Sequence, residues 1–221
     1  MAAQKVIVIT GISSGIGEAT ARHLAHAGHL VYGGARSEGT SSIANLKRRV
    51  VDVTNDTSVT SFIEGVLSEA GRIDILINNA GVSLVGPTEN TSPEEASWVF
   101  NANVLGPLRL IRAVLPSMRA QKSGLIINVS SVLGFLPAPF MGIYAASKHA
   151  LEGMSESLDH EIREFGVRVV LLEPTFTNTK LDVNAVQTAE PIGVYASQFQ
   201  ATVKAVQSQI KSAPSPEFVA Q

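Results

Sequence analysis

The sequence contains no cysteine, which excludes disulfide bonds and thiolate catalysis. It also lacks an excess of charge of either sign, since 17 basic and 19 acidic side chains are interleaved and the formal net charge is -2. Nucleic acids and anionic membranes are bound by clustered basic side chains, so we expect neither as a partner. We interpret the one basic cluster, at 47–49, as a solvated turn or helix end.

Long apolar runs are missing as well. No stretch approaches the roughly 18 residues that a membrane-spanning helix needs, and residues 1–5 show no signal-peptide pattern before the first strand. Together with the absence of cysteine, this favours a cytoplasmic protein without a membrane span. No metal site is expected, because none of the five histidines groups with acids at a ligand spacing: His23, His26, His29, His149 and His160.

The chain instead carries an alternation of short β-branched runs and amphipathic segments. We predict strands at 5–10, 30–35, 50–53, 124–131 and 167–173, and a further strand that begins at Ile73 and runs into the amides at 78 and 79. Helical periodicity lies between them, which is typical of a doubly wound parallel β-sheet, the Rossmann fold. With 221 residues and 45% hydrophobic content, the chain suits a single α/β domain over 1–221.

A glycine-rich turn follows the first strand. Gly11, Gly15 and Gly17 have the spacing G-x-x-x-G-x-G and lead into an amphipathic segment that stops at Gly28. Glycines allow a tight turn and a close approach to a pyrophosphate, which the free N–H groups of a helix N-terminus can bind. An ordinary glycine-rich turn between a strand and a helix is the alternative interpretation.

The second predicted strand ends at Arg36, followed by Ser37 and without an acidic neighbour. In folds of this kind an acid here accepts from the ribose 2′-OH of NAD, whereas a basic side chain accommodates the 2′-phosphate of NADP. Arg36 therefore favours NADP over NAD, unless it simply points into solvent. Asp52, at the end of the third predicted strand, is a candidate acceptor for the adenine amino group.

Tyr144 and Lys148 stand four residues apart at the start of a helical pattern that continues through Leu158. On a helix the two side chains project from one face, where the ammonium favours the phenolate and lowers the tyrosine pKa toward neutral pH. A solvated helix face gives the same spacing. A second helix, capped at Ser92, carries Asn103 next to a Gly-Pro interruption, and such distortions often mark functional sites.

Together, the segments 10–17, 78–81, 103–106 and 144–148, with Ser131, resemble the short-chain dehydrogenase/reductase family over nearly the whole chain. The resemblance implies that Tyr144 exchanges a proton with a carbonyl/alcohol pair and that Ser131 hydrogen-bonds the substrate oxygen. It also implies that Lys148 lowers the pKa of the tyrosine and holds the nicotinamide ribose, and that Asn103 anchors a water of the proton relay. The implied cofactor-binding residues are Thr10, Gly11, Ser13, Ser14, Gly15, Ile16, Gly17, Arg36, Ser37, Asp52, Val53, Asn79, Ala80, Gly81, Tyr144, Lys148, Pro174, Thr175, Thr177 and Thr179.

Two features depart from the family pattern. The usual Pro-Gly after the last predicted strand is Pro174-Thr175, as in relatives similar to retinol and 17β-hydroxysteroid dehydrogenases, which suggests a lipophilic substrate. The chain also stops where the helix before a seventh strand would begin, so we expect the C-terminal strand to be missing. By family likeness we expect a homo-oligomer, either a dimer or a tetramer.

An apolar loop at 132–142 joins Ser131 to Tyr144, and loops of this kind at strand ends usually face a ligand or a partner. We predict that it lines the substrate pocket with Phe135, Leu136, Pro139, Phe140 and Met141, with 180–210 as a further substrate-loop region. The resulting hypothesis is an NADP-dependent oxidoreductase acting on an apolar ketone, aldehyde or alcohol. The alternative is a non-catalytic NADP(H)-binding sensor or regulator.

Overall fold

The computed structural model describes residues 3–179, 181, 186–187 and 193–221. Its centre is a six-stranded parallel sheet in the order β3-β2-β1-β4-β6-β7. The chain winds outward from β1 to β3 and then from β4 to β7, so the predicted doubly wound Rossmann fold is confirmed. The strands are β1 Val6–Thr10, β2 Leu30–Ala35, β3 Leu46–Val50, β4 Ile75–Asn78, β6 Gly124–Val129 and β7 Val167–Leu172.

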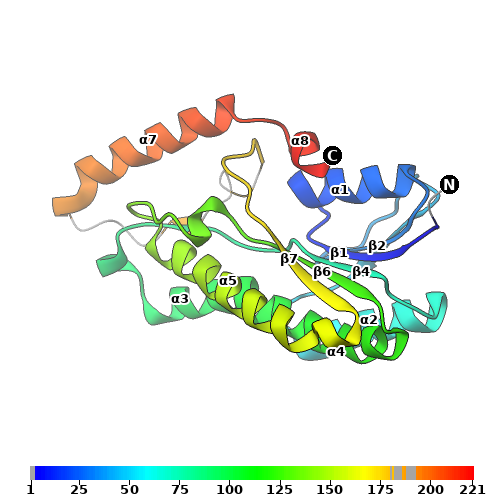
Figure 1. Ribbon diagram of the computed structural model, residues 1–221. Helices are drawn as coiled ribbons and strands as arrows, with labels where there is room; N and C mark the ends of the chain where they lie inside the picture. Colours follow the sequence, from blue (N-terminus) through cyan, green and yellow to red (C-terminus); the bar gives the residue numbers. More distant parts are fainter. Residues whose placement is uncertain (1–2, 180, 182–185, 188–192) are drawn as a thin grey trace.

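Helices cover both faces of the sheet (Figure 1). On one face lie α2 (Asp56–Ala70), α4 (Gly106–Gln121) and α5 (Gly142–Ile162), whose apolar sides meet alternate strand residues such as Val8 and Leu76 in the larger core. On the other face α1 (Gly15–His26) packs on Ile7 and Ile9 through Ala21. Strands buried on both faces read as continuous apolar runs, which explains why β1 is recognisable in the sequence.

The third strand differs from the prediction at 50–53, because β3 spans Leu46–Val50. The basic cluster at 47–49 is therefore neither a turn nor a helix end but the middle of an edge strand. Lys47 and Arg49 lie 5.5 and 5.8 Å from the ring centroid of Tyr32 and form ion pairs with Glu69. Long basic side chains suit an edge strand because their stems cover apolar surface while their charges stay in water.

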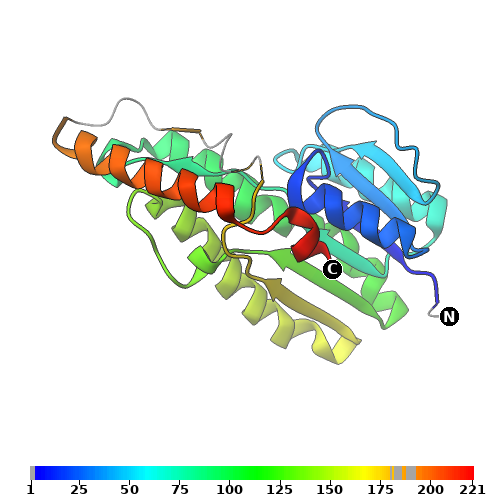
Figure 2. The same ribbon diagram turned by 90° about the horizontal axis from the view of Figure 1, so that it is seen from above.

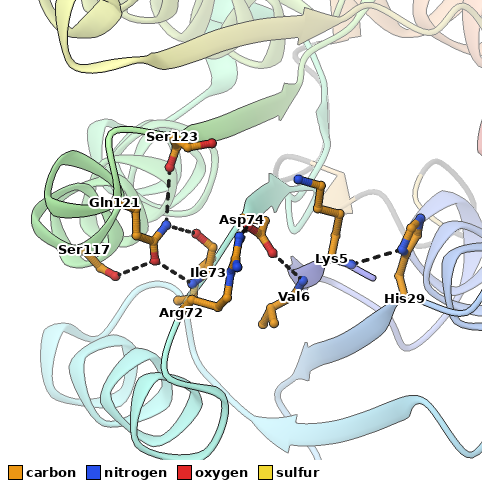
Figure 3. Close-up of polar contacts among 9 residues, drawn as sticks. All are labelled: Lys5, Val6, His29, Arg72, Ile73, Asp74, Ser117, Gln121 and Ser123. Carbon is orange, nitrogen blue, oxygen red and sulfur yellow. Dashed lines mark hydrogen bonds and ion pairs between the residues drawn. The ribbon is translucent and has the colours of Figure 1, made fainter. Parts of the chain in front are cut away.

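Polar contacts fix the amino ends of the central strands (Figure 3). The buried carboxylate of Asp74, just before β4, accepts from the backbone N–H of Val6 at 2.8 Å and forms an ion pair with Arg72. The Gln121 amide donates to the carbonyl of Ile73 at 3.0 Å and to that of Ser123 at 3.3 Å. These contacts join the starts of β1, β4 and β6, so the opposite, carboxyl ends of the strands meet at one edge.

The helix that begins at Ser92 is interrupted as predicted. Its capping box is formed, with Ser92 accepting from the backbone of Glu95 and the Glu95 carboxylate accepting in return, and α3 spans Pro93–Phe100. A π-helical turn then runs over Asn101–Leu105 before α4 begins at Gly106. Pro107 has no N–H and cannot donate the α-helical bond to the carbonyl of Asn103, which accounts for the distortion there.

Asp159 joins the end of α5 to β7. The residue is 9% exposed, and its carboxylate accepts from Arg168 at 2.8 Å, from Arg163 at 2.8 Å and from the backbone N–H of Val169 at 2.9 Å. The hydrogen bond from Arg168, followed by that from Val169, holds the pKa of this carboxyl well below its ordinary value. As the pH falls through about 4, this carboxyl is therefore protonated in the unfolded chain while it stays ionised in the folded chain. Its contribution to the free energy of unfolding is lost as the pH falls further.

We expect Asp159→Asn to lower the free energy of unfolding at pH 7 by about 1 to 2 kcal/mol, because two partly exposed arginines lose a charged acceptor. The difference from the wild type should shrink as the pH falls from 5 to below 3. Thermal unfolding followed by circular dichroism between pH 7 and 3 measures this. Glu161→Gln, which changes an exposed carboxylate on the same helix, is the control. A difference that stays constant over the whole range would contradict the assignment.

Candidate active site

The site lies at the carboxyl ends of β1 and β4, where the order of the strands reverses. In open parallel sheets this switch point is where ligands bind. Figures 1 and 2 show α7 (Ala196–Ser212) on the same side of the sheet as α1, joined to a short helix, α8 (Pro216–Ala220), that packs beside α1. Of the predicted region 180–210, residues 180, 182–185 and 188–192 lie outside the described residues.

The glycine loop is held by Asn79 from the end of β4. Its amide donates to the carbonyls of Thr10 at 2.9 Å and Gly11 at 3.2 Å, and the Thr10 hydroxyl accepts from the backbone of Ala80 at 3.2 Å. A Cβ at Gly17 would overlap both the Asn79 amide nitrogen and the Gly11 carbonyl. Only glycine therefore fits at this position, and the loop can pass close to the end of β4.

The residues of this loop fit the pyrophosphate of a dinucleotide. Gly11 and Gly15 have φ values of +76° and +63°, which favour glycine, and the Ser14 side chain does not cap α1. The first N–H groups of α1 consequently face the loop without a side-chain acceptor from Ser14. The side chain of Thr179 lies close to the loop, since a Cβ on Gly15 would be 3.2 Å from it.

Tyr144 and Lys148 are buried on α5, with 6% and 7% of their surfaces exposed. The Lys148 ammonium lies 5.7 Å from the centre of the Tyr144 ring and donates to the carbonyl of Val129 at 2.8 Å. Burial lowers the pKa of Lys148 to about 8, against the opposing effect of Glu152. The helical spacing therefore places a fixed donor beside a phenol inside the protein.

A cavity of about 610 Å³ brings Ser131 together with Tyr144 and Lys148. Ser131 follows β6, and its hydroxyl accepts from the backbone of Leu133 at 3.1 Å. The carbonyl of Pro174 accepts from Val132 at 3.0 Å, so the segment after β7 closes against the segment after β6. The other predicted residues in the cavity wall are Ile16, Asn79, Gly81, Pro139, Met141, Pro174, Thr175 and Thr177.

Asn103 is 1% exposed and does not contribute to the cavity wall. Its side chain exchanges hydrogen bonds with both backbone groups of Val82, each at 2.9 Å, and donates to the Ser147 hydroxyl at 3.0 Å. Ser147 in turn donates to the carbonyl of Tyr144 at 2.7 Å. The π-helical turn is thereby tied both to the loop after β4 and to the helix that carries Tyr144.

The residues predicted to bind adenosine lie outside the cavity, beyond the ends of β2 and β3. Arg36 is exposed, and its charge helps to lower the pKa of Asp52, although the hydrogen bonds from Thr54 contribute most. Asp52 accepts from the backbone and hydroxyl of Thr54 at 2.9 and 2.7 Å. Val53 packs against Gly106, where a Cβ would approach it to 3.0 Å. The hydroxyls of Ser13 and Ser37 both accept from Arg48 of β3.

The predicted substrate residues are divided by the structure. Pro139 and Met141 line the cavity, whereas Phe135 and Leu136 are 51% and 59% exposed and do not contribute to its wall. Phe140 packs edge-on against Phe199 of α7, with the ring centroids 5.4 Å apart. The apolar loop thus contacts both the cavity and the helix that covers it.

Part of the cavity wall comes from α7, most of which lies inside the predicted substrate-loop region 180–210. No sequence signal shows which surface the apolar side of this helix covers. A small parallel pair also went unpredicted: β5 (Leu84–Val85) with β8 (Val186–Gln187). The wall residues from the predicted region 180–210 are Leu181, Thr202, Val203, Val206, Gln207 and Ile210. The wall residues that were not predicted are Val82, Val85, Val129, Ser130, Val132, Leu133, Ala138, Phe176, Asn178 and Lys211.

The described part of the chain holds neither a metal-binding cluster nor a membrane-spanning helix. Among those residues, no group of three or more histidine or acidic side chains is placed to hold a metal ion. None of the helices within the described ranges combines the length and the apolar character needed to cross a membrane.

Known proteins resemble this chain in both sequence and fold. The short chain dehydrogenase family model matches residues 5–190. A 3-ketodihydrosphingosine reductase of Bacteroides thetaiotaomicron is 40% identical over 215 residues, which cover 96% of this chain and 79% of that protein.

Solved structures of short-chain dehydrogenases are similar to this chain in fold. A short-chain dehydrogenase/reductase of Burkholderia phymatum in complex with NAD has a TM-score of 0.87 at 31% identity, covering 98% of this chain and 83% of that one. A metagenomic short-chain oxidoreductase in complex with NADP has a TM-score of 0.71 at 36% identity, covering 77% and 81%. The chain therefore belongs to the short-chain dehydrogenase family, whose members are oxidoreductases that use a nicotinamide cofactor to interconvert CH–OH and C=O groups.

Proposed function

We propose that this protein is an NADP-dependent oxidoreductase that interconverts an apolar ketone or aldehyde and the corresponding alcohol. The observation that carries the proposal is the shared cavity, in which Ser131, Tyr144 and Lys148 lie together next to the glycine loop. Three such groups in one cavity match the needs of carbonyl reduction, which requires an oriented oxygen, a proton and a neighbouring positive charge.

The bound cofactor supplies or accepts the hydride, and the residues of the chain handle the substrate oxygen. Tyr144 donates a proton to this oxygen during reduction and takes it back during oxidation. Ser131 donates a hydrogen bond that orients the carbonyl. Lys148 stabilises the phenolate of Tyr144 and contacts the nicotinamide ribose, and Asn103 anchors a water of the proton relay through its position in the π-helical turn.

The preference for NADP rests on Arg36, exposed just after β2 without an acidic residue beside it in the sequence. We expect Arg36→Asp to weaken NADPH binding by roughly tenfold or more and to leave NADH binding within about threefold, because the new carboxylate repels a phosphate and can accept from a ribose hydroxyl. Dissociation constants from cofactor fluorescence measure both. An unchanged NADPH/NADH ratio would show that Arg36 does not recognise the 2′-phosphate.

The apolar substrate is inferred from the cavity wall, where Met141, Val203 and Val206 face the same space as Tyr144. The name of the similar Bacteroides protein denotes a ketone reductase, in line with this proposal. Discrimination by apolar pockets is modest, so a range of lipophilic carbonyls should be accepted. We therefore propose screening NADPH oxidation across steroid, retinoid, aromatic and aliphatic carbonyls.

The same screen separates the enzyme from a non-catalytic sensor. An enzyme oxidises NADPH with at least one apolar carbonyl, and a polar set such as short 2-keto acids serves as the negative control. Tight NADPH binding without turnover on any carbonyl would instead support the sensor, and absence of binding would exclude both.

The proposed assembly follows the family expectation. Trp98, Leu105 and Leu108 of the α3–α4 region are 37–43% exposed, which suits a homo-oligomer interface along these helices. We propose a dimer or tetramer, which sedimentation of the purified protein measures. The cytoplasmic location stays a prediction from composition.

A further inference from the structure

We propose that Arg48, in the middle of β3, is a second residue that recognises the ribose 2′-phosphate of NADPH, together with Arg36. The inference rests on the proposed function, because it concerns the same cofactor. Unlike the cofactor-binding residues predicted above, Arg48 lies within a strand, and neither in the glycine loop nor directly after β2.

The pairing of the strands decides where Arg48 points. Successive side chains of a strand face opposite sides, so Lys47 and Arg49 share the side on which Tyr32 and Glu69 lie. Arg48 is paired with Gly33 of β2, and a Cβ on Gly33 would run into the side chain of Ile12 in the glycine loop. Because register partners face the same side, Arg48 emerges toward the glycine loop.

The guanidinium of Arg48 spans two segments already expected to bind the cofactor. Its Nη2 donates to the hydroxyl of Ser13 in the glycine loop at 3.4 Å and to that of Ser37, next to Arg36, at 3.3 Å. The backbone at Gly39 passes close to the group, since a Cβ there would lie 2.9 Å from Nε and 3.1 Å from Cζ. The guanidinium is thus held in place between two hydroxyls.

The charge of Arg48 is not neutralised by a carboxylate within the described residues. Glu69 pairs with Lys47 and Arg49 on the other side of the strand, and no ion pair of Arg48 is found in the described ranges. Its Nε is buried without a hydrogen-bond partner in the same part of the chain. An oriented cation of this kind, flanked by hydroxyls, matches the donors that a phosphate dianion binds most strongly.

The competing interpretation is a purely structural arginine that ties the segment after β2 to the glycine loop. In that case its loss would disturb the adenosine region for both cofactors and would weaken NADPH and NADH binding equally. Recognition of the 2′-phosphate affects NADPH alone. The two interpretations therefore differ in the ratio of the two affinities rather than in the affinity for either cofactor.

The experiment uses the full chain with Arg48→Leu, and with Arg49→Leu as a matched control on the opposite face of the same strand. Dissociation constants of NADPH, NADH and 2′,5′-ADP are measured by calorimetry, without turnover. We expect Arg48→Leu to weaken NADPH and 2′,5′-ADP by roughly 10- to 100-fold and NADH by less than about twofold. Arg49→Leu should leave the NADPH/NADH affinity ratio at the wild-type value. If Arg48→Leu does not fold, Arg48→Gln keeps a shorter stem with a polar but uncharged end, and the same NADPH-specific loss is expected.

An NADPH/NADH ratio that stays at the wild-type value in Arg48→Leu or Arg48→Gln would overturn the assignment, as would an equal loss for both cofactors. If Arg36→Asp changes the ratio while both Arg48 variants leave it intact, only the Arg48 inference fails. A wild type that binds NADH as tightly as NADPH overturns recognition of the 2′-phosphate by Arg48, whereas the carbonyl screen still decides the oxidoreductase. A wild type that binds neither cofactor ends both proposals.

Discussion

Replacing Tyr144 with phenylalanine should lower kcat for carbonyl reduction by about 10³-fold, because the reaction loses the group that transfers the proton. NADPH affinity should stay within about threefold, since the change removes one oxygen from a ring that is 6% exposed and leaves the packing of α5 in place. Single-turnover measurements at saturating NADPH separate the proton-transfer step from binding and product release.

A matched control exists in the same protein. Tyr32 is fully buried in the larger core, and its ring lies against Lys47 and Arg49 of β3. Tyr32→Phe should therefore leave kcat unchanged. Near-normal turnover by Tyr144→Phe with any accepted ketone would exclude the tyrosine mechanism, while an equal loss in Tyr32→Phe would indicate that damage to the fold explains both.

Replacing Lys148 with methionine should have two opposite effects. Turnover should fall by about 10²-fold or more, because the phenol of Tyr144 loses the charge that favours its ionised form. Stability at pH 7 should rise by about 1 to 2 kcal/mol, since a buried ammonium is replaced by an apolar side chain of similar length, although the Val129 carbonyl loses its donor. A stabilised and inactive variant is the signature of a side chain kept for function.

The pH dependence of this stability provides the sharper measurement. Burial lowers the pKa of Lys148 to about 8 from 10.5 in the unfolded chain, so the folded state releases its proton first. The stability of the wild type therefore gains a contribution as the pH rises from 8 toward 10.5, and the advantage of Lys148→Met shrinks over the same range. Denaturant unfolding at pH 7 and pH 9.5 tests this. Lys204→Met, on the exposed face of α7, is the control, and equal stabilities of Lys148→Met and the wild type at pH 7 would contradict the argument.

Much of the fold could be predicted because buried parallel strands have a distinctive composition. The runs that became β1, β2 and β7 are mostly apolar, and each was located to within one residue at either end. The third strand was misplaced because its middle, Lys47 to Arg49, is basic and its partners are a tyrosine ring and Glu69. At a sheet edge, the packing against neighbouring elements decides which residues form the strand, and this packing leaves no local pattern in the sequence.

The same division holds for the site. The motif spacings already determined that Tyr144 and Lys148 would share a helix face, that the glycine turn would precede α1, and that a Gly-Pro pair would interrupt the helix after Ser92, since each of these depends on residues close together in the chain. Only the tertiary structure decided that α7 closes the cavity over Tyr144 and that Arg48 reaches Ser13 and Ser37 from another strand. Those contacts join segments far apart in sequence, and they depend on strand register and helix packing, which no single stretch encodes.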